Sequence, residues 1–132
     1  MRQLEADLLA ADGMTLAEFD VLIQLWFAAG VRLRMTELSE RVRLTPSGIT
    51  RLVDRLARTG LVRRGRCASD RRGTWAILTS AGRQRVDKVR PIHLRSVRRH
   101  FASRLSADQL QALTCALERL APAVPLRVSS AI

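Results

Sequence analysis

The sequence has few of the residues on which many kinds of functional site depend. Its two cysteines, Cys67 and Cys115, are too few for a disulfide framework and have no neighbours at metal-ligand spacing. We expect both to be free thiols, with Cys115 buried. The two histidines, His93 and His100, are seven positions apart, too far for one metal ion to bind both without a further ligand. The composition therefore predicts no metal site.

Long apolar runs are also missing. The most apolar window, VLIQLWFAAGV, is interrupted by Gln24 and is far shorter than the roughly 20 residues of a membrane span. The N-terminal segment MRQLEADLLAADG is acidic and amphipathic, and it lacks the basic and continuous apolar regions of a signal peptide. We therefore expect a cytoplasmic protein with no membrane partner.

Motifs of catalysis are absent as well. The chain contains no glycine-rich phosphate loop, no paired carboxylates and no nucleophile elbow. We expect neither an enzyme nor a bound cofactor.

Arginine, in contrast, is abundant. The 132 residues carry 23 basic side chains against 12 acidic ones, and Lys88 is the only lysine. The charge is uneven, because residues 1–40 hold three arginines and seven acids, whereas residues 41–72 hold ten arginines and only Asp54 and Asp70. So strong an excess of positive charge in one part of the chain favours a polyanion as the partner.

The apolar spacing predicts a series of helices. A short helix runs to Gly13, and Thr15 with Glu18 forms a capping box for a second helix that extends toward Gly30. The segment MTELSERV predicts a short third helix with Thr36 as its N-cap. Only Arg43 and Leu44 separate this helix from the next cap, so the two form a helix-turn-helix candidate.

The fourth helix lies in the segment RLTPSGITRLVDRLARTGLV. Thr45 is the expected N-cap, Pro46 the first helical residue and Gly60 the left-handed stop. Helical spacing predicts a buried stripe of Ile49, Leu52, Val53 and Leu56. The outer face then consists of Ser47, Thr50, Arg51, Asp54, Arg55 and Arg58.

The rest of the chain predicts a hairpin and two more helices. The runs LVRR and TWAIL flank the arginine-rich loop GRCASDRRG, as in a long β-hairpin. A long helix follows, marked by apolar residues from Val86 to Leu105, and Ser106 with Gln109 caps a last helix that ends before Pro122. Apolar stripes on these two helices predict a homodimer.

This order predicts a mainly α protein of the α+β winged-helix class: a helix-turn-helix with a two-stranded β-wing and with N- and C-terminal helices that form a dimerisation region. We expect the DNA-binding lobe in residues 15–79 and the dimerisation region in residues 1–14 and 80–121. Residues 122–132 are expected to form a loose tail.

The sequence resembles the MarR family of bacterial transcriptional regulators from about Leu4 to Leu120. The resemblance is carried by the Thr-Pro-Ser helix start, the helix end LVDRLARTGLV, the tip SDRRG and the exit LTSAG, which occur together in this order. It implies a dimer that places two recognition helices in successive major grooves of a pseudo-palindromic operator in double-stranded DNA.

The resemblance and the helix geometry together name the candidate DNA-binding residues. Ser47, Thr50 and Arg51 lie in the first turns of the recognition helix, where they would reach base edges, whereas Arg55 and Arg58 would contact phosphates. At the wing tip, Arg72 is expected to enter the minor groove and Asp70 to orient it. The full candidate set is Thr36, Thr45, Pro46, Ser47, Thr50, Arg51, Arg55, Arg58, Arg71 and Arg72.

A small aromatic effector is a further expectation from the family. Trp26, Phe27 and Phe101 either line its pocket or belong to the core. The expected function is that of a sequence-specific transcriptional regulator that responds to such a ligand. We expect it to act as a repressor. A nonspecific nucleoid-type DNA- or RNA-binding protein and a module for an acidic protein partner are the alternatives.

Overall fold

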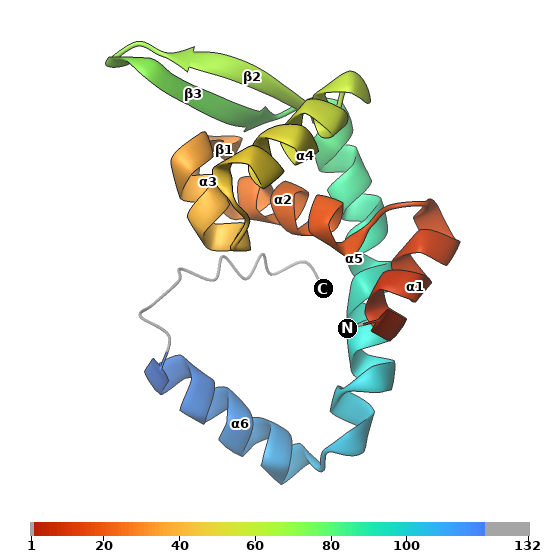
Figure 1. Ribbon diagram of the computed structural model, residues 1–132. Coiled ribbons are helices and arrows are strands. Elements are labelled where there is room, and N and C mark those ends of the chain that lie inside the picture. The colour runs from red at the N-terminus through yellow and green to blue at the C-terminus, as the bar shows by residue number, and fades with distance from the viewer. Residues whose placement is uncertain (1, 121–132) are drawn as a thin grey trace.

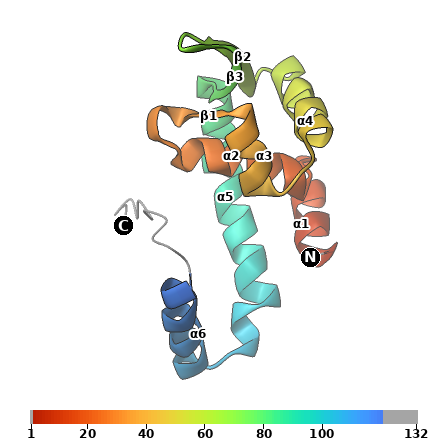
Figure 2. The same ribbon diagram turned by 60° about the vertical axis from the view of Figure 1, so that its left-hand side comes forward.

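The computed structural model describes residues 2–120, except for the side chains of residues 70–72. The elements, in chain order, are α1 (Arg2–Asp12), α2 (Leu16–Phe27), the 3-10 helix η1 (Ala29–Val31), β1 (Arg32–Arg34), α3 (Met35–Val42), α4 (Pro46–Arg58), β2 (Val62–Cys67), β3 (Asp70–Leu78), α5 (Ser80–His100), the 3-10 helix η2 (Ala102–Arg104) and α6 (Ala107–Leu120). Figures 1 and 2 show a lobe of α2, α3, α4 and the sheet, from which α5 leads away to α6. The tail predicted for residues 122–132 lies outside the described residues.

The predicted caps of α2 and α4 are confirmed. The backbone N–H of Glu18 donates to Thr15 Oγ1 at 3.2 Å, and the Thr15 N–H donates to Glu18 Oε2 at 2.9 Å. At α4, the Gly48 N–H donates to Thr45 Oγ1 at 3.1 Å and Pro46 is the first helical residue. Both helices therefore begin where local side-chain chemistry satisfies their free N–H groups.

The predicted cap of α3 is wrong. This helix begins at Met35, its N-cap residue is Arg34, and no side chain caps it, so Thr36 already lies inside the first turn. The reason is β1, which ends at Arg34 and passes directly into the helix.

The sheet has three antiparallel strands in the order β1-β3-β2. The predicted hairpin is confirmed as β2 and β3, whereas β1 was not expected from the sequence. Its central residue Leu33 pairs with Ala76 of β3, and Arg64 of β2 pairs with the same residue from the other side. The hairpin is thus anchored to the lobe through β3.

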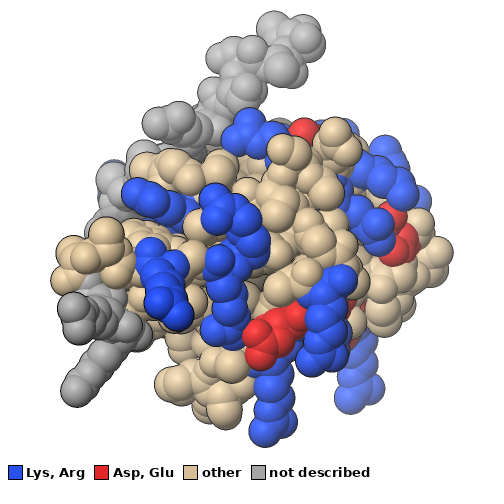
Figure 3. Space-filling model, turned by 90° about the horizontal axis from the view of Figure 1, so that it is seen from above, with Lys and Arg blue, Asp and Glu red and all other residues tan. Residues whose placement is uncertain are grey.

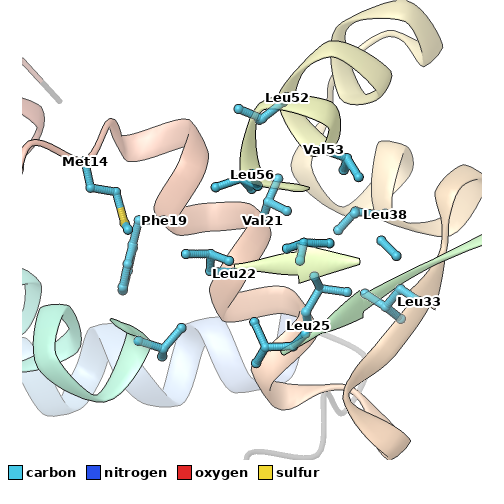
Figure 4. Packing of buried hydrophobic residues seen from close by; sticks show 14 of the residues in the cluster. Met14, Phe19, Val21, Leu22, Leu25, Leu33, Leu38, Leu52, Val53 and Leu56 are labelled. Atoms are coloured by element: carbon cyan, nitrogen blue, oxygen red, sulfur yellow. The ribbon is translucent and has the colours of Figure 1, made fainter. Parts of the chain in front are cut away.

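The core lies between α2 and the helix-turn-helix, and it fixes the orientation of α4. Phe19, Leu22 and Leu25 of α2 are buried; in Figure 4, Leu22 and Leu25 lie toward the sheet, whereas Phe19 lies beside Met14, and its ring packs against His93 of α5. The buried stripe of α4 is confirmed, since its four members are each at most 5% exposed: Ile49, Leu52, Val53 and Leu56. Burial of several such side chains holds the helix in place by several kcal/mol, at about 1.5–3 kcal/mol each.

The C-terminal helices differ from the prediction in two details. The long helix ends at His100 and not at Leu105, because a 3-10 turn follows. The predicted burial of Cys115 is wrong, since it is exposed and α6 has no buried residue. Among the described residues, no helix is long and apolar enough to cross a membrane.

Candidate nucleic-acid interface

The outer face of α4 matches the predicted pattern of exposure. Ser47, Thr50, Arg51, Arg55 and Arg58 are all exposed. Small hydroxyl groups lie near the start of the helix and guanidinium groups follow. Because the opposite stripe is buried, this face is presented on a rigid helix.

The arginines of this face have different partners. Arg55 Nε lies 2.9 Å from Glu18 Oε1, and that glutamate also belongs to the capping box of α2. Within the described residues, Arg51 and Arg58 take part in no ion pair. Both are therefore available to an external anion.

The turn between α3 and α4 is tight. Arg43 adopts a left-handed conformation with φ 53°, and Ser39 Oγ donates to the Leu44 carbonyl at 2.6 Å. Thr45 and Pro46, which follow, lie at the exposed start of α4. This connection sets the two helices in the arrangement of a helix-turn-helix.

A hollow of about 370 Å³ lies between the helix-turn-helix and the sheet. Thr36 from α3 and Thr50 from α4 line it, together with Arg34 and Arg64. The structure thus brings Thr36 and Thr50 to one surface, beside two arginines that are not in the predicted set.

Arg64 connects the hairpin to α4. Its Nη2 lies 2.8 Å from Asp54 Oδ1 and 3.4 Å from the carbonyl oxygen of Thr50. The alternation of β2 indicates the face of the hairpin on which Arg64 lies, but the sequence alone does not reveal its partner on α4.

Arg34 and Trp75 join β1 to the hairpin. The Arg34 guanidinium lies 5.6 Å from the ring centroid of Trp75 and its Nη2 lies 3.4 Å from Cys67 Sγ. Cys67 is buried, and its sulfur also lies 3.2 Å from Ser69 Oγ. Cationic and aromatic side chains therefore stiffen the base of the wing.

Arginines gather on the face that carries the hairpin and α4. In Figure 3, which looks down on this face, basic side chains far outnumber acidic ones. Arg63 and Arg66 of β2 add to the exposed arginines of α4. The side chains of Asp70, Arg71 and Arg72, predicted for the wing tip, lie outside the described part of the chain.

The three aromatic residues proposed for an effector pocket do not form one cluster. Trp26 and Phe27 pack edge to face, with ring centroids 4.9 Å apart, and Arg90 lies over Trp26. Phe101 is 53% exposed and follows Arg90 by eleven residues, about 16 Å along α5. The structure therefore groups Trp26 with Phe27 and separates Phe101 from them.

Two titratable groups, Asp20 of α2 and His93 of α5, interact with each other between these two helices. The His93 ring packs on Phe19 with centroids 4.7 Å apart, and burial lowers the pKa of His93. Partial burial raises the pKa of Asp20. In the described part of the chain, no cluster of three or more metal-ligating side chains is present.

Polar contacts hold α1 along α5. The carboxylate of Asp12 is almost fully buried and pairs with Arg85 at 2.5 Å and Lys88 at 2.7 Å. Asp7 accepts from Ser96 Oγ at 2.5 Å, and this hydrogen bond, with a second contact to His100, lowers the pKa of Asp7. The N-terminal helix is thus attached by its polar side chains to α5, while Leu8 packs into the core shared with the lobe.

Comparison with known proteins agrees with this architecture. A model of the MarR family matches residues 12–73. The helix-turn-helix transcriptional regulator YkoM of Bacillus subtilis is 32% identical over 107 residues, which make up 81% of this chain and 68% of the relative.

Two solved structures from Streptomyces coelicolor are similar over 90% of this chain. AbsC, a MarR family transcriptional regulator, is 38% identical with a TM-score of 0.81 over 80% of its own length. Sco3205, a MarR family regulator solved in complex with DNA, is 34% identical with a TM-score of 0.82 over 77% of its length. Taken with the helix-turn-helix, the arginine-rich hairpin and the exposed face of α4, these similarities show that the chain belongs to the MarR family of DNA-binding transcriptional regulators.

Proposed function

We propose that the protein is a sequence-specific regulator, acting in the cytoplasm as a repressor, that reads its operator with the outer face of α4. The observation that carries this proposal is the order of side chains on that face. Small hydroxyls and Arg51 lie near the N-terminal end, where a helix in the major groove approaches base edges. Arg58 lies about 10 Å further along the helix, where a side chain would contact the phosphate backbone. A helix used only to attract polyanions needs no such order.

The regulator acts as a homodimer in this proposal. Leu94, Phe101, Leu117 and Leu120 of the C-terminal helices are each more than half exposed. So much apolar surface on neighbouring elements favours association, and a second copy related by two-fold symmetry would present two recognition helices to a pseudo-palindromic site. A bound dimer that covers a promoter blocks transcription sterically.

A small aromatic effector would act between the lobe and the dimerisation region. Trp26 and Phe27, with Arg90 over the indole, supply stacking surface and a cation there. Residues 1–14 and 80–121 form the dimerisation region in this scheme, and residues 15–79 form the DNA-binding lobe.

The decisive experiment is a footprint on the DNA immediately upstream of the protein's own gene, made with an excess of competitor duplex. Protection of a two-fold symmetric site that survives the competitor supports sequence-specific binding. Uniform protection, lost as competitor is added, favours the alternative of a nonspecific nucleoid-type protein, to which the net charge of +11 is equally suited.

A further inference from the structure

An acidic residue on a helix that faces DNA needs an explanation. Asp54 is the only acid in α4, and it lies among Arg51, Arg55 and Arg58. An unpaired carboxylate there would repel phosphates. In the structure the carboxylate of Asp54 is paired instead with Arg64 of the hairpin, at 2.8 Å.

The register of the hairpin explains how Arg64 reaches α4. Arg64 is opposite Ala76, which is fully buried, whereas its neighbour Arg63 is opposite Ile77. Successive residues of a strand point to opposite faces, so Arg64 is on the face that looks toward the lobe and Arg63 on the other. The same guanidinium nitrogen also lies 3.4 Å from the carbonyl oxygen of Thr50.

Arg64 lies where the hairpin leaves the lobe. The short strand β1 pairs with residues 75–77 of β3 only, so the rung of Gly65 and Trp75 is the last with three strands, and from Arg66 and Thr74 outward β2 and β3 continue as a two-stranded ribbon. Figures 1 and 2 show this ribbon projecting beyond the helices. A two-stranded ribbon is only marginally stable by itself, so its angle to α4 depends on contacts at its base.

We propose that Arg64 and Asp54 form a brace that sets the angle of the hairpin to α4, and that they act as positioning residues for operator discrimination and not as phosphate ligands. One end of the brace is on a helix held by four buried side chains, and the other is one rung before the sheet loses its third strand. With the brace in place, α4 in the major groove and the hairpin beside it can contact their DNA sites at the same time. This inference rests on the sequence-specific function proposed above.

Direct phosphate binding by Arg64 is the alternative role, and it leads to a different expected result for substitution of Asp54. If Arg64 bound a phosphate directly, Asp54 would compete with that phosphate, and its neutralisation would strengthen binding to every duplex. If the brace acts through geometry, neutralising Asp54 weakens discrimination although it removes a negative charge. The effect of Asp54→Asn on the operator-to-random affinity ratio therefore separates the two roles. The ratio falls if Arg64 acts through geometry, and it does not fall if Arg64 binds a phosphate.

The experiment compares Asp54→Asn, Arg64→Gln and the double variant on operator and random duplexes over a range of salt concentrations. Each single variant is expected to lower the operator-to-random affinity ratio by about two- to fivefold, the range for a partly exposed ion pair. The double variant is expected to lose no more than either single one, because both remove the same contact. The exchanged pair, Asp54→Arg with Arg64→Asp, is expected to recover part of the ratio.

The matched control is Arg63→Gln, which removes the same charge from the opposite face of the same strand. It is expected to change affinity for both duplexes in equal proportion and to leave the ratio unchanged. The brace is overturned if Asp54→Asn raises or leaves unchanged the ratio, if the two single losses add, or if Arg63→Gln lowers the ratio as much. If the wild-type protein shows no preference for any duplex, the proposed function itself fails, which is a separate result.

Discussion

At the scale of single residues, the outer face of α4 is held in place by a few close contacts near the ends of that helix. Thr79 Oγ1 donates to the Gly60 carbonyl at 2.6 Å and accepts from the Gly82 N–H at 3.0 Å, which ties the end of α4 to the start of α5. A Cβ atom at Gly82 would lie 2.1 Å from the carbonyl oxygen of Leu61. The close approach of these two segments therefore requires glycine at position 82.

The first prediction concerns this contact. Changing Gly82 to alanine forces the start of α5 away from the loop after α4 and should lower the free energy of unfolding by about 1–3 kcal/mol, as overpacking does. Denaturant unfolding of the variant measures the loss. The control is Ala81→Ser at the exposed neighbouring position, which should stay within about 0.5 kcal/mol of the wild type. Equal stabilities of the two variants would contradict the packing argument.

The sequence is least informative about the partners of single side chains at the site. The outer face of α4 could be predicted from helical spacing, because burial of one stripe leaves the rest exposed. The pairing of Arg55 with Glu18, and of Arg64 with Asp54, joins elements distant in the chain. Such contacts depend on tertiary packing, so no local pattern predicts them.

At the scale of elements, the helices with strong end signals were the predictable ones. The side chains of Thr15 and Thr45 cap α2 and α4 as expected. The strand β1 has only three residues and is stabilised by pairing with β3, so its own sequence carries too little alternation to reveal it. The error at Thr36 follows, because the strand before α3 moves the start of that helix to Met35.

The two threonines give a matched pair for the second prediction. Thr45→Ala removes the cap of α4 and should lower the free energy of unfolding by about 1 kcal/mol. Thr36→Ala removes an exposed hydroxyl that caps no helix and should leave stability within about 0.5 kcal/mol of the wild type. Thermal and denaturant unfolding without DNA measure both. A larger loss from Thr36→Ala than from Thr45→Ala would show that the helix starts have been misassigned.

At the scale of the whole molecule, the arginine-rich face of the lobe and the exposed apolar side chains of the C-terminal elements lie in different parts of the chain. The lobe presents arginines over the hairpin and α4, while α6 has no buried residue and carries Leu117 and Leu120 on its surface. A basic face on one part of the chain and exposed apolar side chains on another are what a dimeric DNA-binding protein requires.

The third prediction is a dimer in solution. Light scattering at micromolar concentration should report twice the mass of the 14.8 kDa chain. Leu117→Glu places a charge on the apolar surface of α6 and should shift the equilibrium toward monomer, whereas Gln111→Glu, at an exposed polar position of the same helix, should not. A stable monomer of the wild-type protein would contradict the proposed assembly.

The fourth prediction follows from the charge of the lobe. Each phosphate contact made by arginine releases counterions, so roughly 6–10 contacts per dimer should weaken binding by about three to five powers of ten between 50 and 200 mM salt. Fluorescence anisotropy with a labelled duplex gives the slope of affinity against salt. A flat response would argue against a phosphate-contacting interface.

The most direct test of the central claim, that the outer face of α4 reads base edges, compares Arg51→Ala with Arg58→Ala. Binding of each variant is measured on the operator, on operators mutated at single half-site positions and on random duplex. We expect Arg51→Ala to lose about 1–3 kcal/mol of discrimination at one defined half-site position, as for a guanine bound through two hydrogen bonds. Arg58→Ala should weaken binding to all sequences alike. If Arg51→Ala instead produces the same proportional loss on every duplex, α4 is not the recognition helix of this protein.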